Sequence, residues 1–111
     1  MSVLISSRAE EDLACIFAYL WTHHDPEAAE RFRFRVEKAI RQLAENAELG
    51  PHPAWATRHK RVRFWIISKT NYIIFYEPTS QGLSIERILD GRRDVRRIIE
   101  LGIEEPPAET T

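Results

Sequence analysis

The stretch DPEAAERFRFRVEKAIRQLAENAELG, residues 25–50, decides the fold of this chain. Asp25 is a favourable helix N-cap, and Pro26 suits the first helical position, where its missing N–H costs nothing. The Leu-Gly-Pro sequence at 49–51 predicts the end of the helix. Apolar residues recur every three or four positions, which predicts an amphipathic helix with one face on a core. These residues are Ala29, Phe32, Val36, Ile40, Leu43 and Ala47.

A first helix precedes this stretch. Residues 2–6 (SVLIS) predict a short strand, and Ser7 followed by Glu10 matches a capping box, in which the two residues satisfy each other's backbone N–H groups. The helix is expected to run to about residues 21–23, and so short a link to the second helix predicts an antiparallel hairpin. Its apolar face holds Leu13, Ile16, Phe17 and Leu20.

The remainder of the chain predicts a small sheet. A loop at 51–58 is followed by three strands, which the segments SKTN and PTSQG separate as in a meander of hairpins, and then by a helix at 94–101. The predicted fold is α+β, in the order β-α-α-β-β-β-α, with a mostly antiparallel sheet and the helical hairpin on one face. We expect one domain over 1–103 and a disordered tail over 104–111. The three strands are 61–67, 72–77 and 83–89.

Composition narrows the class of protein. The 111 residues suit one domain, and 43% hydrophobic with 30% charged residues is typical of a soluble protein. Neither a membrane span nor a secretory signal is predicted. The single cysteine, Cys15, excludes a disulfide framework, so a reducing cytoplasm is the expected location. His23 and His24 are adjacent on a helix and do not converge, and no metal or cofactor is expected.

The charges are unevenly distributed, although the net charge is only −1. Residues 58–97 hold ten basic and four acidic side chains, whereas residues 1–50 hold six basic and nine acidic ones. The basic half predicts a surface for a polyanion or an acidic partner. The basic residues of the second helix alternate with acids, including the i, i+4 pairs Glu27–Arg31 and Glu37–Arg41, which favours a solvated face over a DNA-recognition helix.

Alternation along the strands assigns the arginines to faces. Val62, Phe64 and Ile66 share the predicted core face, and Arg87 shares a face with apolar neighbours, where it needs a paired acid or a partner surface. We expect the faces that bear arginine to lie away from the hairpin. They hold Arg61, Arg63, Trp65 and Ile67 on one strand, and Leu83, Ile85, Arg87 and Leu89 on another.

The order of these segments resembles the RelE/ParE superfamily of toxins from toxin–antitoxin systems, and its ParE branch in particular. The resemblance covers residues 3–101 and is carried by SSRAEEDLACIFAYL, the 25–50 stretch, NYIIFYE and IERILDGRRD. It implies a small toxin that is neutralised by a cognate antitoxin protein. The ParE branch poisons DNA gyrase, whereas the RelE branch cleaves messenger RNA on the ribosome.

The RelE branch places lysines on the second strand and arginines on the third strand and near the C-terminus. It also places a tyrosine or histidine, which serves as the general acid, on the last helix. When the sequences are aligned through Tyr72, most of these residues are missing, so no catalytic residue is assigned. An RNA-cleaving enzyme would have to use His59, Arg61, Arg63, Arg87 and Arg92 instead. The corresponding positions hold Phe64, Ile66, Ile73 and Ile98, with Asp90 in place of a histidine.

The favoured function is therefore a gyrase inhibitor without catalytic activity. The alternatives are a ribosome-dependent ribonuclease and a non-toxic binding remnant, and direct nucleic-acid binding is less favoured. The candidate target-binding residues are Arg61, Arg63, Trp65, Arg87, Arg92 and Arg93. The candidate antitoxin-binding residues are Trp21, Phe34, Trp65 and Arg87, where Trp21 and Phe34 lie off the apolar stripes, either half-buried at the hairpin edge or lining a groove.

Overall fold

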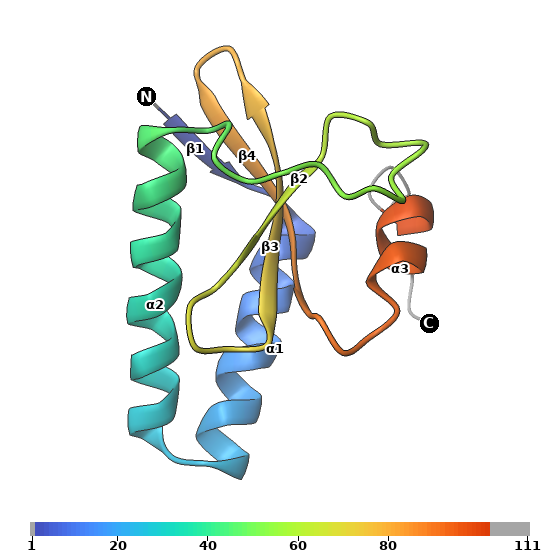
Figure 1. The fold of residues 1–111 in the computed structure, drawn as a ribbon. Helices are drawn as coiled ribbons and strands as arrows, with labels where there is room; N and C mark the ends of the chain where they lie inside the picture. The colour runs from blue at the N-terminus through green and yellow to red at the C-terminus, as the bar shows by residue number, and fades with distance from the viewer. Residues whose placement is uncertain (1, 103–111) are drawn as a thin grey trace.

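The computed structural model describes residues 2–102, which form a four-stranded sheet and three helices (Figure 1). The predicted α+β class and the order of the elements are confirmed. The predicted tail at 104–111 lies outside the described residues. The elements are β1 (Ser2–Ile5), α1 (Ser7–His23), α2 (Pro26–Glu45), β2 (Arg63–Ile66), β3 (Tyr72–Thr79), β4 (Gly82–Asp90) and α3 (Val95–Gly102).

Side-chain caps begin both helices of the hairpin. The carboxylate of Asp25 accepts a hydrogen bond from the Ala28 N–H at 2.7 Å, as predicted for α2. The predicted capping box of α1 is wrong: Ser6, and not Ser7, is the N-cap, and its hydroxyl accepts from the Ala9 N–H at 3.0 Å. Ser6 takes this place because its own N–H continues the pairing of β1 with β4 by donating to the Ile85 carbonyl at 2.9 Å.

Helix α2 ends earlier than its sequence suggested. The last helical residue is Glu45, because the backbone of Asn46 is extended and its side chain accepts from the Glu48 N–H at 3.2 Å. The predicted stop at Leu49-Gly50 therefore lies in the loop that leads to β2. The buried stripe of α2 is Ala29, Phe32, Val36, Ala39 and Leu43.

The strand order in the sheet is β1-β4-β3-β2. The first pair, β1 with β4, is parallel, and the other two pairs are antiparallel, so the sheet is mostly antiparallel as expected. Strand β2 is shorter than predicted, which leaves Arg61, Val62 and Ile67 outside it. It is the outermost strand on its side, with β3 as its single neighbour.

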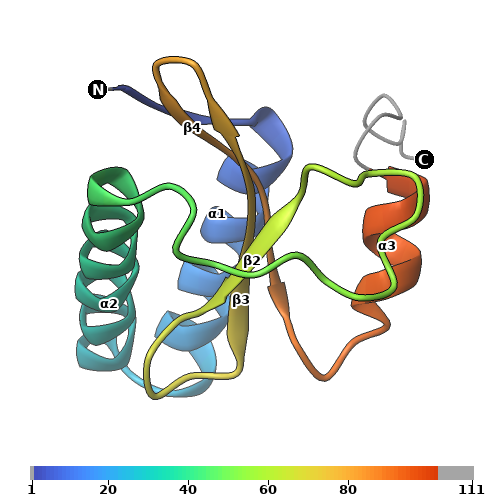
Figure 2. The same ribbon diagram turned by 45° about the horizontal axis from the view of Figure 1, so that its top comes forward.

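The sheet carries a hydrophobic core on each face, and this overturns the expected position of the arginine-bearing faces. On one face Trp65, Ile67 and Ile74 pack with Phe32 and Val36 of the hairpin. The opposite face packs against the 51–62 loop and α3 (Figure 2). Trp65 and Ile67 therefore face the hairpin, where they were expected to face away from it. The second core contains Val62, Phe75, Leu89 and Ile99, with Phe64, Ile73 and Ile98 packed against it.

A β-bulge changes the face on which Arg87 lies. Phe75 pairs with Arg87, but the next residue of β3, Tyr76, pairs with Ile85, so Glu86 is an extra residue in β4. The extra residue breaks the alternation of side chains. Leu83, Ile85 and Ile88 consequently face the hairpin, and the predicted row that placed Arg87 with Leu83 and Ile85 is wrong.

Candidate functional site

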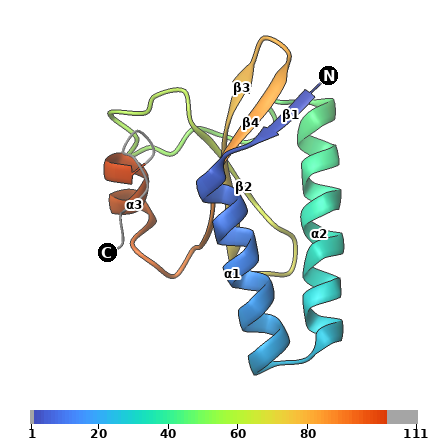
Figure 3. The ribbon, with the colours of Figure 1, turned by 180° about the vertical axis from the view of Figure 1, so that it is seen from behind.

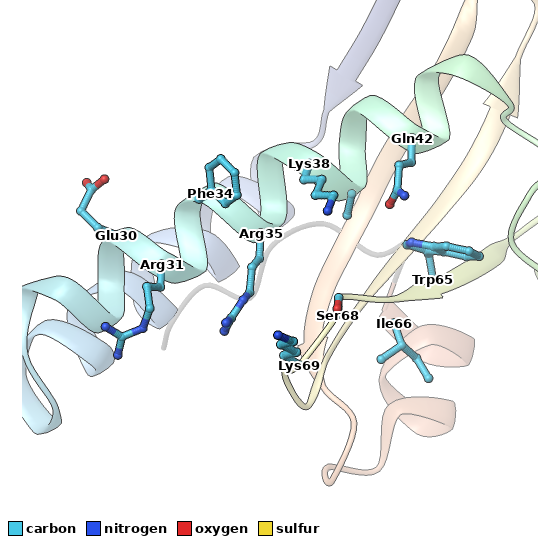
Figure 4. A pocket seen from close by; sticks show the side chains of 11 residues that line it. Glu30, Arg31, Phe34, Arg35, Lys38, Gln42, Trp65, Ile66, Ser68 and Lys69 are labelled. Carbon is cyan, nitrogen blue, oxygen red and sulfur yellow. The ribbon is translucent and has the colours of Figure 1, made fainter.

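A groove of about 650 Å³ runs between α2 and β2 (Figure 4). Helix α2 forms one wall, and Trp65 and Ile66 of β2 with the following turn form the other. Trp65 is half-buried, whereas Phe34 and Ile66 are 61% and 57% exposed. The groove is lined by Glu30, Arg31, Phe34, Arg35, Lys38, Ala39, Gln42, Trp65, Ile66, Ser68 and Lys69.

The helical repeat gathers the cations of the groove. Arg31, Arg35 and Lys38 follow one another at intervals of four and three residues, so they share a face of α2. Figure 4 shows Arg35 projecting toward the turn that holds Lys69 and Arg31 projecting from the same face of α2, while Lys38 and Gln42 project toward Trp65. The groove thus has four cations: Arg31, Arg35, Lys38 and Lys69. None of them forms an ion pair or a side-chain hydrogen bond within residues 2–102. The groove therefore presents four positive charges to whatever enters it.

The ion pairs predicted along α2 do not form as expected. Arg33 binds Glu30 at 2.7 Å and Glu37 at 2.9 Å, so Glu37 is engaged one turn away from Arg41. Arg33 lies on the solvent side of the helix, whereas Arg31 lines the groove, away from its expected partner Glu27. Arg31, Arg35, Lys38 and Lys69 were not among the predicted site residues, although the first three are spaced in the sequence so that they share one face of a helix.

Backbone groups of β2 also open onto the groove. In an antiparallel ladder, alternate residues direct their N–H and C=O groups to opposite sides of the strand. Phe64 donates its N–H outward to the Pro51 carbonyl at 3.0 Å, and Ile67 donates inward to Tyr72 at 2.9 Å. Ile66 therefore has the same outward orientation as Phe64, and its backbone groups face the free edge. An extended segment in the groove can pair with them.

A second cleft of about 400 Å³ continues the groove toward the tip of the hairpin. It shares Arg31, Arg35 and Lys69 with the groove and adds Arg92. Burial raises the pKa of the Tyr72 hydroxyl in this cleft, and the nearby Asp90 adds to the effect, while Arg92 opposes it. Because they share these residues, the groove and the second cleft form one continuous depression lined by cations.

Arg63 has a structural role, because its side chain binds backbone groups of a neighbouring loop. Its guanidinium donates to the carbonyls of Glu48 at 3.2 Å and Gly50 at 2.7 Å, which fastens the loop after α2 to β2. The Gly50 N–H in turn donates to the buried Tyr76 hydroxyl at 2.9 Å, and burial raises the pKa of that hydroxyl. A Cβ at Gly50 would lie 2.3 Å from the Phe64 carbonyl oxygen, so glycine is required for this close approach.

Arg87 has the paired acid that its apolar surroundings demand. Its guanidinium binds the Asp12 carboxylate of α1 at 2.8 and 2.9 Å, and the two side chains are 14% and 13% exposed.

The other predicted site residues are spread over the surface and the interior. Trp21 is 61% exposed in α1, His59 is buried, Arg92 binds Asp90 at 2.6 Å, and Arg61 and Arg93 are exposed. The structure thus brings Phe34 and Trp65 together in the groove and leaves Trp21 and Arg87 outside it.

The positions that hold catalytic residues in the RelE branch are apolar and largely converge. Phe64, Ile73 and Ile98 all pack in the second core between the sheet and α3. Ile66 lies at the rim of the groove instead. These positions supply neither a cation nor an acid–base group for RNA cleavage.

No cluster of three or more His, Cys, Asp or Glu side chains within residues 2–102 could hold a metal ion. No helix in the same range is long and apolar enough to span a bilayer.

Comparison with known proteins identifies relatives in sequence and in structure. Residues 3–95 match the model of a family described as the ParE toxin of the type II toxin–antitoxin system parDE. Among solved structures, a chain of a chromosomal ParDE toxin–antitoxin system from P. aeruginosa superposes with a TM-score of 0.66 at 19% identity. The match covers 79% of this chain and 92% of that one, and at this identity it shows a common fold. No curated protein matches the sequence.

Proposed function

Because the chain belongs to the ParE toxin family of type II toxin–antitoxin systems, we propose that it inhibits DNA gyrase and is neutralised by an antitoxin bound in the groove between α2 and β2. The observation that carries the antitoxin part is the groove itself. It combines four cations that have no side-chain partner among residues 2–102, the apolar side chains of Trp65 and Ile66, and an open strand edge.

These features match the chemistry of an acidic, partly apolar segment. Carboxylates of the segment would meet Arg31, Arg35, Lys38 and Lys69, and its apolar side chains would cover Trp65 and Ile66. Its backbone would add a strand beside β2, since strand addition obtains affinity from main-chain hydrogen bonds and specificity from side-chain pockets. The related solved structure is itself described as part of a ParDE toxin–antitoxin system, which supports an antitoxin partner.

The test of the antitoxin site compares two charge reversals on α2. Arg35→Glu lies in the groove, whereas Arg41→Glu is exposed on the same helix outside it. Titration calorimetry with the product of the adjacent reading frame should show at least about a tenfold weaker complex for Arg35→Glu, equivalent to 1.4 kcal/mol. Arg41→Glu should bind like the wild type. Equal affinities for both variants would place the antitoxin elsewhere.

Gyrase is the proposed target because the family is ParE and the ribonuclease positions Phe64, Ile73 and Ile98 lie in a core. The purified protein is expected to inhibit supercoiling by gyrase and to trap cleaved DNA. Absence of both effects at micromolar concentration would refute this target. Messages cleaved at defined sites after induction would favour the ribonuclease alternative, and unaffected growth without antitoxin would favour a non-toxic remnant.

A further inference from the structure

The end of the molecule around α3 carries a second basic surface. We define the α3 surface as six exposed cations: three in the loop before β2, one in the turn before α3, and two in α3 itself. None of their side chains forms an ion pair within residues 2–102. They are Arg58, Lys60, Arg61, Arg93, Arg96 and Arg97.

The packing of α3 fixes the direction of its arginines. Val95, Ile98 and Ile99 pack in the second core, so the intervening Arg96 and Arg97 are directed to solvent. The loop is fastened to the same helix, because the Glu100 carboxylate accepts from the Thr57 hydroxyl at 2.6 Å and from the Arg58 N–H at 3.3 Å. The two halves of the α3 surface are therefore held side by side.

Within residues 2–102, the acidic groups near this surface are already engaged in hydrogen bonds. Glu100 is bound to the loop, and Asp90 is bound to Arg92 at 2.6 Å. Asp94 accepts from the Arg97 backbone N–H at 3.3 Å at the start of the helix. Positive charge therefore dominates the α3 surface.

The α3 surface is separate from the groove. The groove lies on the hairpin side of the sheet, and α3 packs on the opposite face, as Figure 2 and the rear view in Figure 3 show. A segment that fills the groove would leave α3 uncovered. The α3 surface therefore remains available to another partner while the antitoxin occupies the groove.

We propose that the α3 surface binds the phosphate backbone of duplex DNA. The inference deepens the proposed gyrase function, on which its biological setting rests, because gyrase acts on DNA. Protein interfaces commonly combine arginine with aromatic anchors such as tryptophan and tyrosine. Along α3 the one strongly exposed large apolar side chain is Leu101, against five exposed arginines in the surface. Arginine forks suit phosphate oxygens, and contacts of this kind carry no base specificity.

The test uses two triple variants that each remove three positive charges. Arg93→Ala/Arg96→Ala/Arg97→Ala alters the α3 surface, and Arg31→Ala/Arg35→Ala/Lys38→Ala alters the groove. Fluorescence anisotropy with a labelled duplex of mixed sequence is measured over a salt series. For the α3 triple we expect a loss of affinity on the order of 100-fold near 0.1 M salt, and a salt slope smaller by roughly two to three. The groove triple should bind nearly as tightly as the wild type.

Each other outcome of the anisotropy measurement contradicts the inference. Equal losses in both triples would indicate attraction by overall charge, and no binding by the wild type would refute the DNA contact directly. A triple that keeps its DNA affinity but no longer inhibits gyrase would show that α3 contacts protein. The two proposals fail separately: wild-type protein that binds DNA through α3 without inhibiting gyrase would refute only the gyrase target. Thermal unfolding of both triples verifies that each is folded.

Discussion

The carboxylate of Asp12 binds the guanidinium of Arg87 at 2.8 and 2.9 Å and also accepts the backbone N–H of Ile88 at 2.9 Å. Strand β1 pairs with β4 only between Gly82 and Ile85, so the edge of β4 beyond that point lacks a neighbouring strand. Asp12, which lies on α1, supplies the hydrogen-bond acceptor for the Ile88 N–H at this edge. One side chain thus joins the first helix to the strand next to the bulge.

Asp12→Ala is expected to destabilise the fold, because it leaves a largely buried guanidinium and a backbone N–H without their acceptor. Loss of one partner of a buried ion pair costs about 3 kcal/mol, which urea unfolding resolves. The neighbouring Glu11 is exposed, and Glu11→Ala should change the free energy of unfolding little. Equal stability of the two variants would contradict the proposed role of Asp12.

Arg63→Ala should destabilise the protein, whereas Arg61→Ala should not. Arg63 binds two carbonyls in the loop after α2, while Arg61 is exposed and has no side-chain partner within residues 2–102. A hydrogen bond to a charged group contributes about 1.5–3 kcal/mol. Because the longer bond to the Glu48 carbonyl is exposed and only the bond to Gly50 is part-buried, the expected loss is about 2 kcal/mol. Urea unfolding and growth after induction should be measured on both variants. If Arg63→Ala is fully stable and non-toxic, Arg63 binds the target instead.

Glu86→Gln should stabilise the protein above the pH range in which glutamate ordinarily titrates. Burial raises the pKa of Glu86, the neighbouring Glu77 adds to this, and the Ser84 hydroxyl and His59 oppose it. The folded state therefore holds its proton more tightly than the unfolded state does, and the stability from this group is lost as pH rises through the raised pKa. The variant should match the wild type below about pH 4 and exceed its unfolding free energy at pH 8.

The exposed Glu11→Gln is the matched control for this pH dependence. It removes the same charge without removing a buried carboxylate. A difference between Glu86→Gln and wild type that is constant with pH would show that the effect comes from packing and not from titration.

The presence and order of the helices were predictable because apolar spacing is local, although the cap of α1 and the end of α2 differ from the prediction. Asp25 and Pro26 began α2 where expected, and α3 was expected at 94–101 and is observed at Val95–Gly102. The faces of the strands were not predictable in the same way. The bulge at Glu86 depends on pairing between β3 and β4, and alternation along one strand cannot reveal an extra residue relative to its partner.

The residues of the groove could likewise be predicted from the sequence only in part. The spacing of Arg31, Arg35 and Lys38 was visible, but whether this face meets solvent or a groove depends on where β2 packs against α2. Trp65 lines the groove, but it was expected on the side away from the hairpin and lies on the hairpin side, because both faces of this sheet are apolar. Alternation divides a strand into two faces, and tertiary packing decides which helix covers each.

Ile66→Pro separates strand addition at β2 from other ways of filling the groove. Proline removes the outward N–H of Ile66, and an edge strand tolerates proline where the N–H does not join the ladder. The variant should therefore fold, with an unfolding temperature close to that of Ile66→Ala. We expect Ile66→Pro to bind the antitoxin at least about tenfold more weakly than Ile66→Ala in calorimetry, since one main-chain hydrogen bond is lost and the proline ring obstructs the edge. Equal affinities would mean that the side chain of Ile66 matters and its backbone does not. A docked helix, and not an added strand, would then occupy the groove.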